Sequence, residues 1–276
     1  MDAQLPRLIG IVNVTPDSFS DGGRFLEPQR AIEHGRRLRA EGAQILDIGG
    51  ESTRPGAEPV GVKQELERVL PVIEGLASVR ATISIDTVKP AVAAAALEAG
   101  ATIINDVTAL SDPEMAALCA ERGAEVILMH MRGTPQTMQL DPRYDDVVDD
   151  VKAFLSERIE LALDAGIERR RIMVDPGIGF GKTLEHNLEL LRRLGELREL
   201  GSPLVLGTSR KSFLEALTGR DVDARLGGSI ASNVLGMAAG ADLLRVHDVA
   251  ATREAVLVAT AILGRRPWRA PQEVGG

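Results

Sequence analysis

The strongest indication of the fold is the stretch Val174-Asp175-Pro176-Gly177-Ile178-Gly179-Phe180-Gly181-Lys182. A short apolar run, residues 172–174, ends in the Asp175 carboxylate and a glycine-rich turn, and a helical segment follows from residue 184. This is the pattern of a buried strand that runs into a βα-loop. Two nucleotide-binding motifs are excluded, because a Walker A loop needs glycine at position 176 and a Rossmann fingerprint needs glycine at position 182.

The same strand-then-polar pattern recurs along the chain. Apolar runs of strand length lie at residues 8–12, 45–48, 83–85, 103–104, 126–129, 172–174, 204–206 and 243–246. Segments with helical periodicity lie at 28–41, 63–76, 90–98, 113–122, 147–165, 184–200, 224–240 and 250–263. Several of these segments are followed by a glycine that suits a left-handed C-cap, namely Gly42, Gly100, Gly123 and Gly166. Eight strand–helix units predict a closed (β/α)8 TIM barrel, with a doubly wound open sheet as the alternative.

The composition agrees with a barrel of parallel strands. The chain has 276 residues, of which 44% are hydrophobic but only 3% are aromatic, so its core must be built from aliphatic side chains. Such a core suits parallel strands that are covered by helices. No linker or low-complexity segment interrupts the chain, and we expect a single domain over residues 1–276, with a core at about 8–264 and a short C-terminal tail.

Charge and cysteine content limit the partners and the location. The net charge of −8 argues against a nucleic acid or an anionic membrane as partner, although a small basic pocket can still hold an anion. Cys119 is the single cysteine, which excludes an intrachain disulfide and is expected in a reducing compartment. The first residues lack the apolar segment of a signal peptide, and no apolar run approaches the roughly 20 residues that span a bilayer. We therefore expect a cytoplasmic protein.

Polar residues follow the proposed strands and form a ring. They are Asn13, the loop 49–54, Asp86, Asn105, Asp106, His130, Asp175, the loop 209–211, Arg245, His247 and Asp248. In a barrel these positions all face the C-terminal mouth, where such enzymes place their chemistry. N-capping explains some of them singly, but not a set this rich in amides, carboxylates and cations.

The charges of this ring divide into two groups. Asp86, Asn105 and Asp175 offer acceptors and one amide, which suit a flat heterocycle that bears N–H and amino groups. The cations Arg54, Lys211 and Arg245, together with His247, suit a phosphate or a carboxylate. The sequence therefore predicts a mouth that holds a ring on one side and a phosphate-like group on the other.

These motifs resemble those of the dihydropteroate synthase family, the folate-pathway enzymes that sulfonamides inhibit. The resemblance covers the chain from residue 8 to about residue 263. The matching stretches are Asn13-Val14-Thr15-Pro16-Asp17-Ser18-Phe19-Ser20-Asp21-Gly22-Gly23, Gly49-Gly50-Glu51-Ser52-Thr53-Arg54-Pro55-Gly56, Ser84-Ile85-Asp86-Thr87, Asn105-Asp106, the Asp175–Lys182 loop, Ser209-Arg210-Lys211-Ser212 and Arg245-Val246-His247-Asp248. They follow the family's order.

The resemblance implies condensation of 6-hydroxymethyl-7,8-dihydropterin diphosphate with 4-aminobenzoate, to give dihydropteroate and diphosphate. It assigns the pterin to Asp86, Asn105, Asp175 and Lys211, and the diphosphate to Asn13, Arg54, Arg245 and His247. It assigns 4-aminobenzoate to Thr53, Pro55, Phe180, Lys211 and Ser212. It implies Mg2+ between Asn13 and the phosphate oxygens, catalytic work by Asp17, Arg54, Lys211, Arg245 and His247, and a homodimer with small-molecule substrates.

Three other functions stay open from the sequence. A pterin-dependent methyltransferase shares the barrel and its acidic ligands, but does not need the Ser-Thr-Arg-Pro-Gly loop. A silent pterin-binding paralogue is expected to have lost loop residues such as Asp17 and Arg54, which are present. A sugar-phosphate enzyme on a similar barrel leaves the acidic side of the mouth unexplained.

Other titratable residues have simpler readings. Cys119 is expected to be a small buried hydrophobe. His34 and His186 are expected to be solvated residues on helices. His130 suits either a structural hydrogen bond or the active site, and Lys182 suits a charge at a helix start.

Overall fold

The computed structural model describes residues 5–15, 26–52 and 56–264, and its strands form one parallel sheet. The strands are β1 (Arg7–Asn13), β2 (Ile45–Gly49), β3 (Thr82–Asp86), β4 (Ile103–Asp106), β5 (Glu125–Met129), β6 (Ile172–Asp175), β7 (Val205–Leu206) and β8 (Leu243–Val246). Their order in the sheet is β6-β5-β4-β3-β2-β1-β8-β7. A parallel bridge between Val174 and Leu204 joins β6 to the segment that enters β7, and Val174 N donates to Pro203 O at 3.0 Å. The sheet therefore closes on itself. This confirms the predicted barrel and excludes the alternative of an open sheet.

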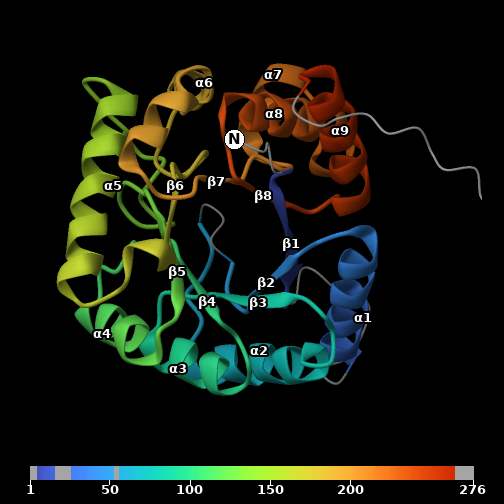
Figure 1. Cartoon of the computed structure of the whole chain (residues 1–276), viewed down its shortest axis with the longest axis vertical. Coiled ribbons are helices and arrows are strands. Elements are labelled where there is room, and N and C mark those ends of the chain that lie inside the picture. Colours follow the sequence, from blue (N-terminus) through green and yellow to red (C-terminus); the bar gives the residue numbers. More distant parts are fainter. Residues whose placement is uncertain (1–4, 16–25, 53–55, 265–276) are drawn as a thin grey trace, which may run out of the picture.

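Helices alternate with the strands and surround them (Figure 1). The α-helices are α1 (Leu26–Glu41), α2 (Val62–Leu76), α3 (Pro90–Glu98), α4 (Pro113–Arg122), α5 (Val147–Asp164), α6 (Leu184–Arg192), α7 (Ser212–Thr218), α8 (Leu226–Ala239) and α9 (Val249–Ile262). Short 3-10 helices are η2 (Arg169–Arg171), η3 (Leu194–Leu200) and η4 (Val222–Ala224). The four glycines expected as C-caps all have positive φ, between 61° and 117°.

Two helical predictions need correction. The single helix predicted over 184–200 is an α-helix to Arg192 and then the 3-10 helix η3. The 3-10 segment approaches helix α8 closely at Gly195, where an added Cβ would lie 3.3 Å from Ala239 O. Helix α7 lies outside the predicted helical segments, since its seven residues are too few to show a clear period.

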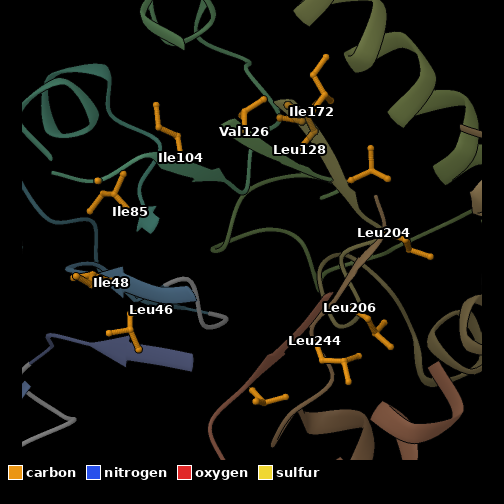
Figure 2. Packing of buried hydrophobic residues seen from close by; sticks show 14 of the residues in the cluster. Leu46, Ile48, Ile85, Ile104, Val126, Leu128, Ile172, Leu204, Leu206 and Leu244 are labelled. Atoms are coloured by element: carbon orange, nitrogen blue, oxygen red, sulfur yellow. The ribbon is translucent and has the colours of Figure 1, made fainter. Parts of the chain in front are cut away.

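The larger part of the core lies between the strands and the helices. Alternate strand residues point outward from the barrel and pack under the helical ring (Figure 2). The labelled examples are Leu46, Ile48, Ile85, Ile104, Val126, Leu128, Ile172, Leu204, Leu206 and Leu244. Cys119 of α4 belongs to this cluster and is fully buried, and burial raises the pKa of its thiol to about 12. The prediction of a buried cysteine is confirmed.

A smaller apolar cluster fills the inside of the barrel. It consists of Ile9, Ile45, Ile103, Ile127, Met173, Val205 and Leu243, which come from seven of the eight strands. These side chains close the barrel below the mouth, so the residues two positions further along each strand lie on top of an apolar floor. Among the described residues, no helix is long and apolar enough to cross a membrane.

Candidate active site

A polar layer lies above the apolar floor, on the same inward-facing strand positions. The residue two positions after Ile45 is Asp47, after Ile103 it is Asn105, after Met173 it is Asp175 and after Leu243 it is Arg245. In the strand register, Ser84 of β3 pairs with Asp47 and with Ile103, which both face inward. Ser84 therefore faces inward, and so does Asp86, two residues further along the same strand. The strand period thus gathers the polar side chains of β2, β3, β4, β6 and β8 at the C-terminal end of the barrel.

Arg245 forms the centre of this layer. Its Nε donates to Asp47 Oδ2 at 2.7 Å, and its Nη2 donates to Asp86 Oδ2 at 2.8 Å. Asn105 Nδ2 donates to the same Asp47 oxygen at 3.1 Å. Asp47 is fully buried, and Asp86 and Asn105 are 9% and 5% exposed. The Arg245 guanidinium therefore joins β8 to β2 and β3, and Asp47 joins β2 to Asn105 of β4.

Arg245 compensates the charge of the buried Asp86 only in part. Burial raises the pKa of Asp86 to about 7, and nearby Asp47 adds to that rise, while Arg245 opposes it. Burial also opposes the charge of Arg245, but Asp47 and Asp86 outweigh it and raise the pKa of the guanidinium. One cation thus serves two buried carboxylates, and Asp86 is left incompletely compensated.

Asp175 and Lys211 form the other side of the mouth. Asp175 Oδ1 accepts from Gly177 N at 2.7 Å, and burial raises the pKa of Asp175 against the opposing effect of Lys211. Desolvation lowers the pKa of Lys211 to about 8, although Asp175 favours its charge. Lys211 Nζ donates to Ile178 O and lies 4.6 Å from the centroid of the Phe180 ring. The lysine is therefore held between the aspartate and the β6–α6 loop.

Two hydrogen-bonded pairs join the loop after β7 to the loop after β8. Ser209 Oγ lies 3.0 Å from His247 Nδ1 and accepts from His247 N at 3.2 Å. Arg210 donates to both oxygens of Asp248, at 3.0 and 2.6 Å. Arg210 has a positive φ of 58°, a conformation that this bidentate pair helps to hold. The pairs hold His247 and Asp248 directly after the end of β8.

Small residues leave room above the floor. An added Cβ at Gly207 would lie 3.8 to 3.9 Å from Arg245 Cβ, Asp175 Oδ2 and Lys211 Nζ. An added Cβ at Gly49 would lie 3.7 Å from Asp86 Oδ2. Because both positions face inward, the absent side chains leave space next to the charged groups, where a flat ring can lie.

The remaining predicted site residues divide into described and undescribed ones. Asn13 is the half-buried last residue of β1, and Ser212 is the exposed first residue of α7. Phe180 is half-buried and follows Asp175 in the β6–α6 loop. Asp17, Thr53, Arg54 and Pro55 lie outside the described residues.

One member of the layer was missed by the sequence analysis. Asp47 stands inside the apolar run 45–48, whereas the predicted polar ring consists only of residues that follow such runs. The signal was present, because a carboxylate in the middle of a buried strand requires a partner. Asp47 Oδ1 and its strand neighbour Ser84 Oγ are buried and have no hydrogen-bond partner among the described residues. The interior of the barrel is therefore more polar than the sequence analysis predicted.

Several polar residues near the mouth have structural contacts. Asp106 accepts from Thr108 N at 2.8 Å and from Leu110 N at 2.9 Å, and so holds a loop in which Leu110 has a φ of 59°.

The two histidines expected to be solvated both make hydrogen bonds. His34 Nε2 lies 3.2 Å from Ile11 O, and His186 completes a capping box at the start of α6.

The described residues offer little to a resident metal. No group of three or more His, Cys, Asp or Glu residues that could hold a metal ion occurs in 5–15, 26–52 and 56–264. Asn13 offers a single neutral oxygen at the mouth. This fits Mg2+ only in the form that keeps several waters and arrives on substrate phosphates, because that form needs few protein ligands.

Comparisons with known proteins agree with this geometry. The pterin-binding enzyme family matches residues 9–247. Dihydropteroate synthase of Escherichia coli (strain K12) is 46% identical over 267 residues, which cover 96% of this chain and 95% of that protein. The structure of Xanthomonas albilineans dihydropteroate synthase with 4-aminobenzoic acid is 51% identical, with a TM-score of 0.90, and the match covers 95% of this chain and 94% of that one. A structure from the same organism with 7,8-dihydropteroate is 48% identical, with a TM-score of 0.86 and 95% of both chains covered. The chain therefore belongs to the pterin-binding enzyme family and, within it, to the dihydropteroate synthases.

Proposed function

We propose that the polar mouth of the barrel carries out the dihydropteroate synthase reaction, with its carboxylate side on the pterin and its cationic side on the diphosphate. The chain is a transferase that condenses 6-hydroxymethyl-7,8-dihydropterin diphosphate with 4-aminobenzoate. The observation that carries the assignment of sides is the buried set Asp86, Asn105 and Asp175 above an apolar floor. The two carboxylates accept hydrogen bonds, and a neutral pterin ring supplies donors for them.

The pterin lies in this proposal between Asp86, Asn105, Asp175 and Lys211. Asp86 and Asp175 accept from the N–H and amino groups of the ring, while Lys211 and the Asn105 amide donate to its acceptors. Both aspartates have raised pKa values because they are buried. Each hydrogen bond from the ring favours the ionised form, so binding restores the charges that burial disfavours.

The diphosphate lies towards Asn13, Arg54, Arg245 and His247. Arg245 is already oriented by Asp47 and Asp86, and His247 is already oriented by Ser209, so neither needs to reorganise as the substrate binds. Asn13 would help hold Mg2+ on the phosphate oxygens, and the ion would supply positive charge for the leaving group.

The aminobenzoate site is assigned to Thr53, Pro55, Phe180, Lys211 and Ser212. The contact between Lys211 and the Phe180 ring supports this position, because it forms a wall with one apolar and one cationic part. Such a wall suits an aromatic ring that carries a carboxylate.

The chemical step follows from the distribution of charge. As the bond between the pterin methylene and diphosphate breaks, negative charge grows on diphosphate, where Arg54, Arg245 and His247 stabilise it. Positive charge grows on the methylene and the ring, next to Asp86 and Asp175. The aminobenzoate nitrogen then attacks the methylene, so the protein supplies no nucleophile, in agreement with the buried Cys119. Asp17 belongs to the catalytic set by resemblance.

Quaternary structure, domain organisation and location are part of the same proposal. We assign one domain over residues 1–276, a cytoplasmic location and a homodimer. Exposed apolar side chains on neighbouring helices support a dimer face, namely Leu235 of α8 and Val258 and Ile262 of α9, with exposed fractions of 69%, 55% and 79%. Large apolar side chains exposed on two adjoining helices are what a partner surface would cover.

The decisive experiment measures turnover by the purified protein. Pterin diphosphate is supplied with and without 4-aminobenzoate and Mg2+, and both diphosphate and dihydropteroate are measured. We expect diphosphate release that is coupled to dihydropteroate formation and abolished by a chelator. Tight pterin binding without turnover would instead indicate a silent pterin-binding protein, and turnover with a methyl donor would indicate a methyltransferase.

The pterin assignment is tested by Asp175→Asn in binding calorimetry. The variant keeps the shape of the side chain but replaces one acceptor by a donor, and we expect pterin affinity to fall at least about 100-fold, since two hydrogen bonds to a charged group are lost or inverted. Asp145→Asn changes an exposed aspartate that is not among the proposed ligands and serves as the matched control. Unchanged pterin affinity in Asp175→Asn would contradict the assignment.

A further inference from the structure

Lys182 is a buried lysine that the proposed reaction does not use. It is 3% exposed, so it is a buried group and more than the charge at a helix start that its position in the sequence suggested. Its Nζ lies 2.8 Å from His130 Nδ1, 3.0 Å from Phe180 O and 3.5 Å from His130 O. Among the described residues it has no ion pair with a carboxylate.

Burial of this amine without an ion pair is expensive. Desolvation lowers the pKa of Lys182 well below the ordinary lysine value, and the nearby Lys211 cation lowers it further, against the attraction of Asp175. Such a group is retained in a folded protein only if its hydrogen bonds are made. The three acceptors around Nζ are therefore the reason why the lysine is tolerated at this position.

The hydrogen bonds of Lys182 join two separate parts of the fold. His130 follows the end of β5, and its ring packs edge-on against Phe154 of α5, with 4.9 Å between the ring centroids. Phe180 belongs to the β6–α6 loop, two residues before the lysine. Lys182 thus ties the carbonyl of Phe180 to a histidine that is fixed by α5.

The loop around Phe180 has little freedom to compensate for a lost contact. Gly177 and Gly181 have positive φ values of 65° and 62°, and an added Cβ would lie 1.9 Å from His130 O and 2.7 Å from Arg132 O, respectively. The backbone of the loop is therefore pressed against the segment that follows β5. The direction of the Phe180 carbonyl and the direction of its ring are consequently set together.

We propose that Lys182, with His130 as its partner, is a positioning residue that holds Phe180 in place for 4-aminobenzoate. The inference rests on the proposed function, in which Phe180 and Lys211 form the wall of the aminobenzoate site. Phe180 lies against Lys211, with 4.6 Å between Nζ and the ring centroid, so a shift of the loop alters both halves of that wall. Among the proposed pterin ligands, Asp86, Asn105 and Asp175 stand on strands and have no hydrogen bond to Lys182. Lys211 is assigned to both substrates, so the selective effect is expected to come from the Phe180 side of the wall.

The test is Lys182→Met, which keeps the length of the side chain and removes its hydrogen bonds. We expect the KM for 4-aminobenzoate to rise about tenfold, which corresponds to about 1.4 kcal/mol, while the KM for pterin diphosphate stays within about twofold. Lys152→Met is the matched control, because Lys152 lies on α5 and bonds to Glu199 at 3.0 Å, away from the mouth. It should leave both KM values unchanged.

A purely structural role for Lys182 predicts a different pattern. In that case Lys182→Met lowers the unfolding temperature and the amount of active enzyme, but leaves both KM values of the remaining enzyme unchanged, and the proposal is wrong. An equal rise in both KM values would also overturn it. If Lys182→Met does not fold, Lys182→Gln keeps one donor and is expected to raise the KM for 4-aminobenzoate selectively, by a smaller factor. Failure of the proposed function itself is distinguishable, because then the unaltered protein forms no dihydropteroate.

Discussion

Replacing Asp86 by Asn is predicted to stabilise the folded protein at alkaline pH while it damages pterin binding. Asp86 is 9% exposed, and burial raises its pKa from 3.8 to about 7 although Arg245 stands beside it. Asparagine has nearly the same shape and, like the protonated acid, carries no charge. The variant therefore removes the cost of keeping a buried carboxylate ionised.

The magnitude follows from the linkage between protonation and folding. Between pH 3.8 and about 7 the folded state holds the proton while the unfolded state has lost it, so the stability of the unaltered protein falls as the pH rises. A rise of about three pKa units at 1.36 kcal/mol each corresponds to about 4 kcal/mol in total. About 3 kcal/mol of this falls between pH 5 and pH 8, since most of that interval lies below the folded pKa.

The assay is urea unfolding of both proteins at pH 5 and pH 8. The free energy of unfolding of Asp86→Asn, relative to the unaltered protein, is expected to increase by about 3 kcal/mol from pH 5 to pH 8. Other groups that titrate in this range are common to both proteins and cancel in the difference. Asp145→Asn, at an exposed aspartate, is the control and should show no such change. A relative stability that is independent of pH would refute the reasoning, since it would mean that Asp86 ionises normally in the fold.

Two further predictions concern the space beside Gly207 in the mouth and the ion pair between Lys89 and the buried Glu65. Gly207→Ala is expected to weaken pterin binding at least about tenfold while the unfolding midpoint in urea changes little, because the new Cβ meets its neighbours at 3.8 to 3.9 Å but occupies the space beside Asp175 and Lys211. Equal pterin affinity in calorimetry would place the ring elsewhere. Lys89→Met is expected to lower the free energy of unfolding by about 3–5 kcal/mol, because Glu65, whose side chain is fully buried, would lose its ion pair at 2.5 Å. A loss below about 1 kcal/mol, the value of an exposed pair, would contradict that reading.

The strands and the gathering of polar residues at one mouth could be predicted because both depend on local patterns. Apolar runs and the polar residues after them are visible in the sequence, and a closed barrel brings them to one mouth. Asp47 was missed because its role depends on which way its side chain points within the strand. The side chain points into the barrel, where Arg245 and Asn105 approach it from other strands. Lys182 was misread for a similar reason, since its burial depends on the packing of the β6–α6 loop against the end of β5. Contacts between segments far apart in the chain leave no periodic signal.

The charges of the mouth connect stability with the binding of the ring. Three buried carboxylates, Asp47, Asp86 and Asp175, stand near two cations, Arg245 and Lys211, and the pKa values of Asp86 and Asp175 are raised. The protein without substrate therefore keeps acceptors whose ionised form is incompletely stabilised. A pterin ring that donates hydrogen bonds to these carboxylates stabilises the ionised form. Its binding thereby offsets the loss of folding stability that burial of the charges causes. It follows that the loss of pterin affinity and the gain in stability should appear together in Asp86→Asn, because both arise from the same carboxylate charge.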